Sequence, residues 1–127
     1  MSAPPAATIS LQQIYQAIKG PRPKGMRVLT DGLWPRGLSK ATLEKEQIIW
    51  YRGASPATEL RQGFHQQQIT AEQFDERYRA QLRADAEQLA PLLEYVRNGP
   101  LVLLTAMKDP EHTYLSQLRD ELIAALK

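Results

Sequence analysis

The order of the predicted elements indicates an α/β fold. We expect one domain in which a small, mainly parallel β-sheet is flanked by helices in a three-layer, Rossmann-like arrangement. Short apolar runs that suit strands alternate along the chain with segments of helical periodicity. The run at 101–104 is continuously apolar and bounded by turn signals, which is typical of a strand covered on both faces. Such alternation is typical of parallel sheets with helices packed on them.

The first half of the chain supplies two predicted strands and a short helix. Residues 9–18 have a weak helical period, although their start equally suits an edge strand. Residues 27–30 form the first clear strand. Ser39 can cap a helix over 40–46, and the apolar run at 47–51 suits a buried strand.

The middle of the chain is predicted to be helical. Ser55 and Pro56 form an N-cap followed by proline at the first helical position, which predicts a helix over 57–64. The capping-box pattern that begins at Thr70 opens a second helix over 71–82. The apolar residues Phe74, Tyr78 and Leu82 recur every four residues and define its buried face.

Strong local signals also mark the last third of the chain. A helical pattern that includes Leu89 and Leu92 ends at the sequence Asn98-Gly99-Pro100, with glycine and proline in the order that stops a helix. After the strand at 101–104, Asp109 and Pro110 repeat the N-cap and first-position proline device. They predict a final helix over 112–126, in which Leu115, Leu118, Leu122 and Leu126 form the buried stripe.

Composition fits an ordinary soluble domain. The 127 residues are 43% hydrophobic and 24% charged, and they suffice for one domain with a real core. We expect a flexible tail over 1–8 and the single domain over 9–127. No apolar run is long enough for a membrane helix, and the start of the chain lacks the features of a signal peptide, so we expect a cytoplasmic protein without membrane contacts. The sequence leaves the oligomeric state open.

Several kinds of chemistry are disfavoured by the sequence. The absence of cysteine removes disulfides and thiol catalysis, and two histidines 46 residues apart make a zinc site improbable. The glycine-rich loops of nucleotide-binding proteins and the hydrolase nucleophile elbow are missing. We therefore expect no metal and no cofactor. A net charge of +2 is too small to indicate nucleic acid by itself, and no tight, sequence-specific duplex binding is expected.

The loop after the first clear strand carries the leading candidate residues. Asp31 could act as a general base, accept a hydrogen bond from a ligand, or bond its own backbone in a turn. Arg36 lies between Pro35 and Gly37 and offers a planar fork of donors for phosphate or carboxylate, or else fastens the loop to Asp31 or to backbone carbonyls. Trp34 could stack on a base or sugar, or cover the core as a lid.

A second set of candidates follows the strand at 101–104. If Asp109 caps the final helix, His112 is its third residue, a titratable imidazole at an anion-attracting terminus. A buried structural histidine is the alternative. If the two strands are neighbours, Asp31, Arg36 and His112 converge at their carboxyl ends, where ligands bind in such folds. We place Lys40 and Asp109 at the rim of that cleft.

These candidates also carry a family resemblance. The chain resembles the YeaO-like branch of domain of unknown function family 488 over roughly residues 12 to 125. The matching positions are Arg27, Asp31, Trp34-Pro35-Arg36-Gly37, Ser39-Lys40, Trp50, Ser55-Pro56, Glu59-Leu60-Arg61, Phe64, Phe74, Tyr78, the strand from Leu101 to Thr105, Asp109, Glu111 and His112. The resemblance implies a fold and a site but no reaction.

The chain departs from the family pattern at two places. The arginine that follows the aspartate in the family is Gly32 here, so the resemblance carries over no ligand contact at that position. In other branches His112 corresponds to the histidine of a Cys-His-Arg motif, in which Glu111 and Thr113 now replace the cysteine and arginine. This replacement argues against a thiol mechanism.

The functional expectation is a binder of a small anionic ligand, a nucleotide or a phosphorylated metabolite. Asp31, Trp34, Arg36 and His112 are expected to line one pocket, with Arg36 and a helix N-terminus holding the anion. If a reaction occurs, His112 and Asp31 are the acid–base candidates, and hydrolysis without a cofactor is the least demanding class. The alternatives are a nucleic-acid-binding regulator and a protein-interaction module without catalysis.

Overall fold

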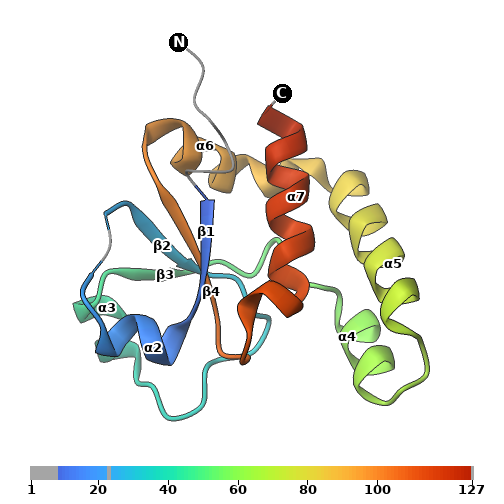
Figure 1. Cartoon of the computed structure of the whole chain (residues 1–127), viewed down its shortest axis with the longest axis horizontal. Coiled ribbons are helices and arrows are strands. Elements are labelled where there is room, and N and C mark those ends of the chain that lie inside the picture. Colours follow the sequence, from blue (N-terminus) through green and yellow to red (C-terminus); the bar gives the residue numbers. More distant parts are fainter. Residues whose placement is uncertain (1–8, 23, 127) are drawn as a thin grey trace.

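The sheet that the described residues form has four strands and is parallel throughout. The computed structural model describes residues 9–22 and 24–126, and the tail predicted over 1–8 lies outside them. The strand order is β1-β4-β2-β3, with every pairing parallel (Figure 1). The strands are β1 (Ile9–Gln13), β2 (Met26–Leu29), β3 (Ile48–Trp50) and β4 (Leu101–Thr105). The predicted α/β fold is confirmed.

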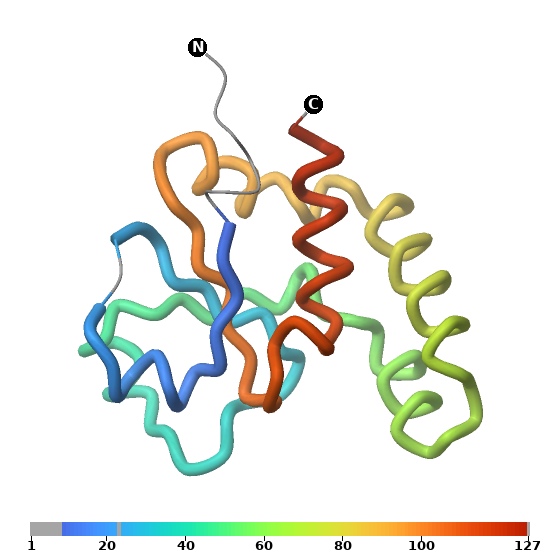
Figure 2. The backbone as a smooth tube through the Cα atoms, in the orientation of Figure 1, coloured from blue at the N-terminus to red at the C-terminus, as the bar shows by residue number. Residues whose placement is uncertain are grey.

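Helices cover both faces of the sheet and give the predicted three layers. One face is covered by α2 (Ile14–Lys19) and α3 (Lys40–Lys45), the other by α5 (Ala71–Ala84), α6 (Ala90–Asn98) and α7 (Tyr114–Leu126). Helix α4 (Thr58–His65) packs on α5 beyond the sheet (Figure 2). Short 3₁₀ turns occupy Ala86–Leu89 and Pro110–His112. Among the described residues, no helix is both long and apolar enough to cross a membrane.

Strand β4 is the centre of the core. All five of its residues are buried, because β4 lies between β1 and β2 and has helices on both faces. Its side chains alternate between the two layers: Leu101 and Leu103 join the cluster under α5 to α7, and Val102 and Leu104 join the cluster under α2 and α3. The continuous apolar run therefore serves both faces, as predicted.

Several of the local signals in the sequence are confirmed. Thr70 accepts the backbone N–H of Gln73, whose side chain accepts the backbone N–H of Thr70 in return, so the capping box at the start of α5 is complete. Phe74, Tyr78 and Leu82 are all buried on one face of that helix. Helix α6 ends at Gly99, whose φ of 154° is a backbone conformation that glycine adopts readily and other residues rarely adopt.

Residues 9–18 are not one element. The edge-strand alternative is confirmed for their start, since β1 pairs with β4 and has no other neighbour in the sheet within the part of the chain that the structure describes. The chain then turns directly into α2, whose buried residues Ile14 and Ala17 face the sheet. The weak helical period of this segment arises because a strand and a short helix bury their apolar residues in immediate succession.

The predicted cap at Ser55 is wrong. Its hydroxyl donates to the carbonyl of Arg52, and α4 begins after Ala57. The side chain of Gln81 on α5 binds the backbone at this helix start instead. It accepts from the N–H of Ala57 and donates to the carbonyl of Ser55, both at 2.8 Å. A long-range contact thus replaces the local cap.

The predicted start of the final helix is also wrong. Asp109 has a left-handed backbone (φ 51°) and makes no side-chain cap; a 3₁₀ turn follows, and α7 begins at Tyr114. Thr113 caps the helix instead, because its Oγ1 accepts the backbone N–H of Leu115 at 3.2 Å. His112 therefore precedes the helix and is not its third residue.

The central strand gives a direct test of the core. We expect Leu103→Ala to lower the free energy of unfolding by about 2–5 kcal/mol, because it leaves a cavity where a fully buried side chain meets α7. Leu33→Ala is the matched control, since Leu33 is 63% exposed and its loss should cost less than about 0.5 kcal/mol. Urea unfolding followed by circular dichroism measures both. Equal losses would contradict the placement of β4.

Candidate functional site

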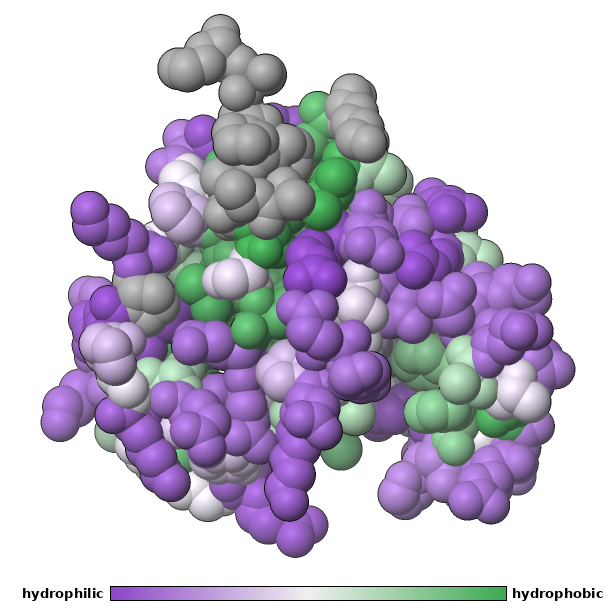
Figure 3. Space-filling view, in the orientation of Figure 1, coloured by the Kyte–Doolittle hydropathy of each residue, from purple (hydrophilic) through white to green (hydrophobic). Residues whose placement is uncertain are grey.

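The candidate residues lie at the carboxyl edge of the sheet. Leu29 of β2 is paired with Leu104 of β4, so the two strands that precede the candidate loops are neighbours, as the convergence argument required. The loop after β2 runs beyond this edge before it reaches α3 (Figure 2). Space-filling shows that hydrophilic side chains dominate the lower edge of the face in view (Figure 3).

Asp31 accepts hydrogen bonds from three other segments of the chain. Its Oδ2 accepts the backbone N–H of Ala106 at 2.8 Å, just after β4, and its Oδ1 accepts the hydroxyl of Tyr114 at 2.5 Å, at the start of α7. Its carbonyl accepts the indole N–H of Trp50 at 2.8 Å. Asp31 therefore joins β2, β3, β4 and α7, and it does not bond its own backbone in a turn.

Two buried tyrosines lie next to Asp31: Tyr114 bonds it directly, and Tyr78 packs against Tyr114. The Tyr114 hydroxyl also lies 2.9 Å from Oγ1 of Thr30. Burial raises the pKa of Tyr114 well above its ordinary value, and the negative charge of Asp31 raises it further. Tyr78 packs edge-on against Tyr114 and donates to the carbonyl of Ala54 at 2.6 Å; burial raises its pKa as well. Both phenols therefore stay protonated donors at neutral pH.

The loop that carries Arg36 has a defined shape. Residues 35–38 form a turn closed by the N–H of Leu38 and the carbonyl of Pro35, and Gly37 supplies the positive φ (82°) that this turn requires. Tyr15 of α2 donates to the carbonyl of Arg36 at 2.6 Å. The backbone of Arg36 is thus fixed while its side chain is exposed, and no hydrogen bond joins that side chain to Asp31 or to a carbonyl in the described residues.

Trp34 forms a small aromatic cluster beside this turn. Its ring packs edge-on against Trp50, with centroids 4.9 Å apart, and its indole N–H donates to the carbonyl of Leu38 at 2.6 Å. Arg52 lies over the Trp50 ring at 4.8 Å from the centroid. Trp34 still leaves 37% of its surface exposed, so it is available to stack on a ligand.

Arg61 lies against the backbone of the same loop. A Cβ placed on Gly32 would come within 2.6 Å of Nη1 of Arg61. The guanidinium therefore occupies the space that a side chain at position 32 would enter. Sequence reasoning missed Arg61, Trp50, Arg52 and Tyr114 as site residues; the first two were visible among the family matches, whereas Tyr114 gave no local signal.

The remaining predicted residues are exposed. His112 lies in the 3₁₀ turn, and its side chain makes no hydrogen bond to any described residue, so it is not the buried structural histidine of the alternative. Lys40 is the first residue of α3 and makes no ion pair within the described chain. The convergence of Asp31, Trp34, Arg36 and His112 on one pocket stays a prediction. Among the described residues, no three His, Asp or Glu side chains gather as metal ligands would.

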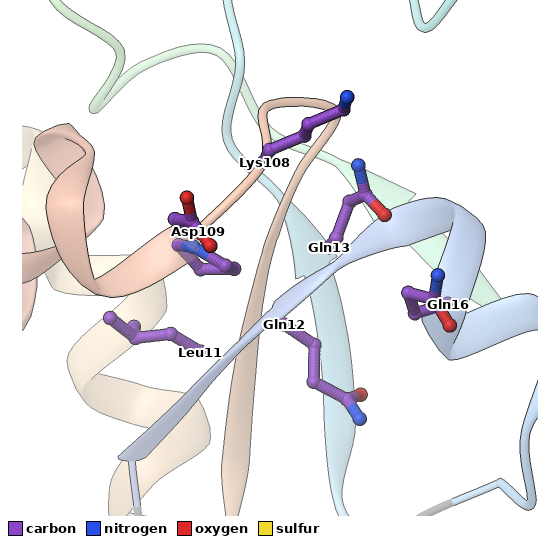
Figure 4. A pocket seen from close by; sticks show the side chains of 7 residues that line it. Leu11, Gln12, Gln13, Gln16, Lys108 and Asp109 are labelled. Carbon is purple, nitrogen blue, oxygen red and sulfur yellow. The ribbon is translucent and has the colours of Figure 1, made fainter.

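Asp109 lines a hollow at the carboxyl ends of β1 and β4. The hollow has a volume of about 440 Å³, and its lining residues are Leu11, Gln12, Gln13, Gln16, Lys108, Asp109 and Pro110 (Figure 4). It lies where the chain leaves β1 toward the α2 face and leaves β4 toward the α7 face, the position at which parallel sheets bind ligands. Gln13 extends to the same side as Lys108, while Gln12 points away. The buried Oε1 of Gln12 has no hydrogen-bond partner among the described residues.

Several arginines form ion pairs within the described residues. Arg79 and Arg83 of α5 share Glu121 of α7, at 3.4 and 3.0 Å, and Arg119 pairs with Glu111 at 2.8 Å. The basic residues around the loop after β2 differ in their ion pairing. Within the described residues no carboxylate forms an ion pair with Arg36, Lys40, Arg52 or Arg61.

Comparison with known families identifies the chain. Residues 8–127 match the family model DUF488-N3i, described as "Inactive DUF488-N3 subclade". The chain belongs to this family, and the resemblance to domain of unknown function family 488 is confirmed. No solved structure matches the chain.

Relatives are found in several bacteria. The chain is 34% identical over 96 residues to "Uncharacterized protein YeaO" of Escherichia coli, a match that covers 76% of this chain and 82% of the relative. It is 30% identical over 94 residues to "Uncharacterized protein Rv3073c" of Mycobacterium tuberculosis, covering 74% and 77% of the two chains. The protein from Mycobacterium bovis called "Uncharacterized protein Mb3100c" matches to the same extent.

The bond between Asp31 and Tyr114 can be tested by removing one hydroxyl. We expect Tyr114→Phe to destabilise the protein by about 1–3 kcal/mol, because Asp31 and Thr30 lose a shared buried partner. Tyr95→Phe is the control, since no hydrogen bond of the Tyr95 hydroxyl is found among the described residues. Chemical unfolding measures both variants. An unchanged stability of Tyr114→Phe would show that the bond contributes nothing.

The raised pKa values of Tyr114 and Tyr78 make stability depend on pH. Tyrosines of the unfolded chain ionise near pH 10.0, whereas these two stay protonated in the folded protein at that pH. Their contribution is therefore complete below about pH 10 and is lost as the pH rises further. We expect the phenolate absorbance of both tyrosines to appear only with alkaline unfolding. Their ionisation in a protein that is still folded would contradict this assignment.

Proposed function

We propose that this member of the inactive DUF488-N3 subclade binds an anionic ligand at the carboxyl edge of its sheet and does not transform it. The ligand is a nucleotide or a phosphorylated metabolite. The observation that carries the proposal is the cationic group around the loop after β2, which consists of Arg36, Lys40, Arg52 and Arg61 and has no carboxylate partner in the described residues. Guanidinium groups without an internal partner are suited to bind phosphate.

The aromatic residues add a preference for a planar group. Trp34 is held edge-on by Trp50 and keeps part of its surface exposed. An indole fixed in this way can stack on a base or a sugar without losing much conformational freedom. Arg36 projects from the turn at 35–38, whose backbone is held by Tyr15 and Gly37. The site thus offers a stacking surface and a phosphate contact on one rigid loop.

Arg61 has a particular place in this proposal. The family pattern carries an arginine directly after the aspartate, and this chain has Gly32 there. The guanidinium of Arg61 fills the adjoining space. We propose that Arg61 supplies at this position the positive charge that the side chain of residue 32 does not.

The absence of turnover is proposed from the state of the two acid–base candidates. Both carboxylate oxygens of Asp31 accept internal hydrogen bonds, which suits a residue that positions the loop. His112 is exposed, and no described side chain holds its imidazole in one orientation, as a general base requires. The description of the matching family as inactive agrees with this proposal.

The proposal is tested by ligand binding to matched variants. With AMP as the probe, we expect calorimetric titration to detect binding to the native chain and roughly tenfold weaker binding to Arg36→Ala, since one charge-assisted contact is lost. Arg97→Ala is the control, because Arg97 is equally exposed but lies on α6, away from the loop. Equal weakening in both variants would remove Arg36 from the site.

The same samples test for catalysis. We expect no release of phosphate from AMP or glucose 6-phosphate above the uncatalysed rate. Hydrolysis that disappears in His112→Gln, while AMP binding remains, would make His112 a catalytic residue and overturn the non-catalytic part of the proposal.

A further inference from the structure

Exposed apolar side chains gather near the cationic group. Among the described residues, the large apolar side chains that are most exposed are Leu33 at 63%, Trp34 at 37%, Met107 at 50% and Phe64 at 43%. Phe64 lies apart on α4, where it packs against Phe74. The other three lie on two loops that the bond between Asp31 and Ala106 holds side by side. Exposed apolar residues that cluster mark an interaction site more often than those that are scattered.

Positive charges surround these apolar side chains. Arg36 and Lys40 follow Trp34 along the chain, Arg52 lies over Trp50, and Lys108 follows Met107. All four are exposed, and none forms an ion pair within the described residues. We name residues 31–40, 51–53 and 106–109 the edge surface. It combines stacking and apolar contacts with several cations.

The shape of the edge surface favours an extended ligand. A pocket for a small molecule typically encloses most of the ligand surface. Leu33, Trp34 and Met107 instead project from the surface, and the hollow at Lys108 and Gln13 continues it toward β1 (Figure 4). One nucleotide would cover only part of this area, whereas several linked nucleotides could contact it in succession.

We propose that the edge surface binds single-stranded nucleic acid with little sequence preference. This inference rests on the proposed function and names its ligand: the mononucleotide is one unit of the strand. Arg36, Lys40 and Lys108 contact successive phosphates, a base stacks on Trp34, and Leu33 and Met107 contact neighbouring bases.

The same features disfavour a duplex. Bases in a duplex are stacked on one another, so Trp34 could not reach their faces. Recognition of a duplex groove usually places a helix with basic side chains in it. Of the helices that begin at this edge, α2 and α3 have six residues each. Helix α7 is longer, but its one arginine, Arg119, is paired with Glu111. The surface therefore suits a strand whose bases are unpaired.

Fluorescence anisotropy with labelled oligonucleotides tests the inference. The probes are oligothymidylate and oligouridylate of about three and about fifteen nucleotides, within the range of known single-strand sites. We expect the longer strands to bind markedly more tightly than the short ones and than dTMP. With three phosphate contacts, affinity should fall about twentyfold between roughly 50 and 200 mM salt.

Two substitutions separate stacking from charge. Trp34→Ala should weaken binding of the longer strand roughly tenfold, and Trp34→Phe should restore most of it because a ring is kept. Lys108→Ala, an exposed position that is not expected to affect folding, should reduce the salt dependence by about one phosphate contact. Arg97→Ala on α6 should leave both quantities unchanged.

The outcomes are distinct. Long strands that bind no more tightly than dTMP would overturn this inference and leave the proposed function standing, provided that dTMP binding depends on Arg36. A hairpin duplex that binds as tightly as the single strand would overturn the inference as well. If neither dTMP, AMP nor the strands bind, both proposals fail. A preference between the thymidylate and uridylate strands distinguishes DNA from RNA as the source of the ligand.

Discussion

The carboxylate of Asp31 is the interaction on which the carboxyl edge of this protein depends. The ends of β2 and β4 lie side by side, and the chain must leave both of them without abandoning buried polar groups. Asp31 meets this demand by accepting the N–H of Ala106 and the hydroxyl of Tyr114 at once. Each oxygen of this partly buried side chain has a hydrogen-bond donor, so neither is left without a partner. The hydrogen bonds of Asp31 therefore fix the start of the loop after β2, which carries Trp34 and Arg36.

Charge is used in two different ways on the two sides of the molecule. Between α5 and α7, the arginines close on Glu121, which is itself buried, and these contacts hold the helices together. At the edge surface, Arg36 and Arg52 have no such partner in the described residues. A protein with a net charge of only +2 can thus present a local positive region, because the basic residues of the edge surface form no ion pair within the described residues. The net charge of the chain therefore does not reveal this local positive region.

The position after Asp31 illustrates how a family site can change while its surroundings persist. Gly32 removes a side chain from the loop, and Arg61 reaches the same space from α4, nearly thirty residues further along the chain. A glycine is needed there as long as Arg61 keeps its place, since an added Cβ would meet the guanidinium. Gly32 and Arg61 are thus adjacent in the fold, although nearly thirty residues separate them in the sequence.

The sequence by itself determined the features that depend on interactions between residues close together in the chain. The buried run of β4, the capping box at Thr70 and the helix stop at Gly99 depend on residues a few positions apart, and each is present as predicted. The α/β class followed from their order. The tertiary structure decided the rest. The final helix begins at Tyr114, because Asp109 has a left-handed backbone, a 3₁₀ turn follows it, and Thr113 caps the helix. The Tyr114 hydroxyl is then bonded to Asp31, 83 residues away. Contacts over such distances leave no periodic trace in the sequence.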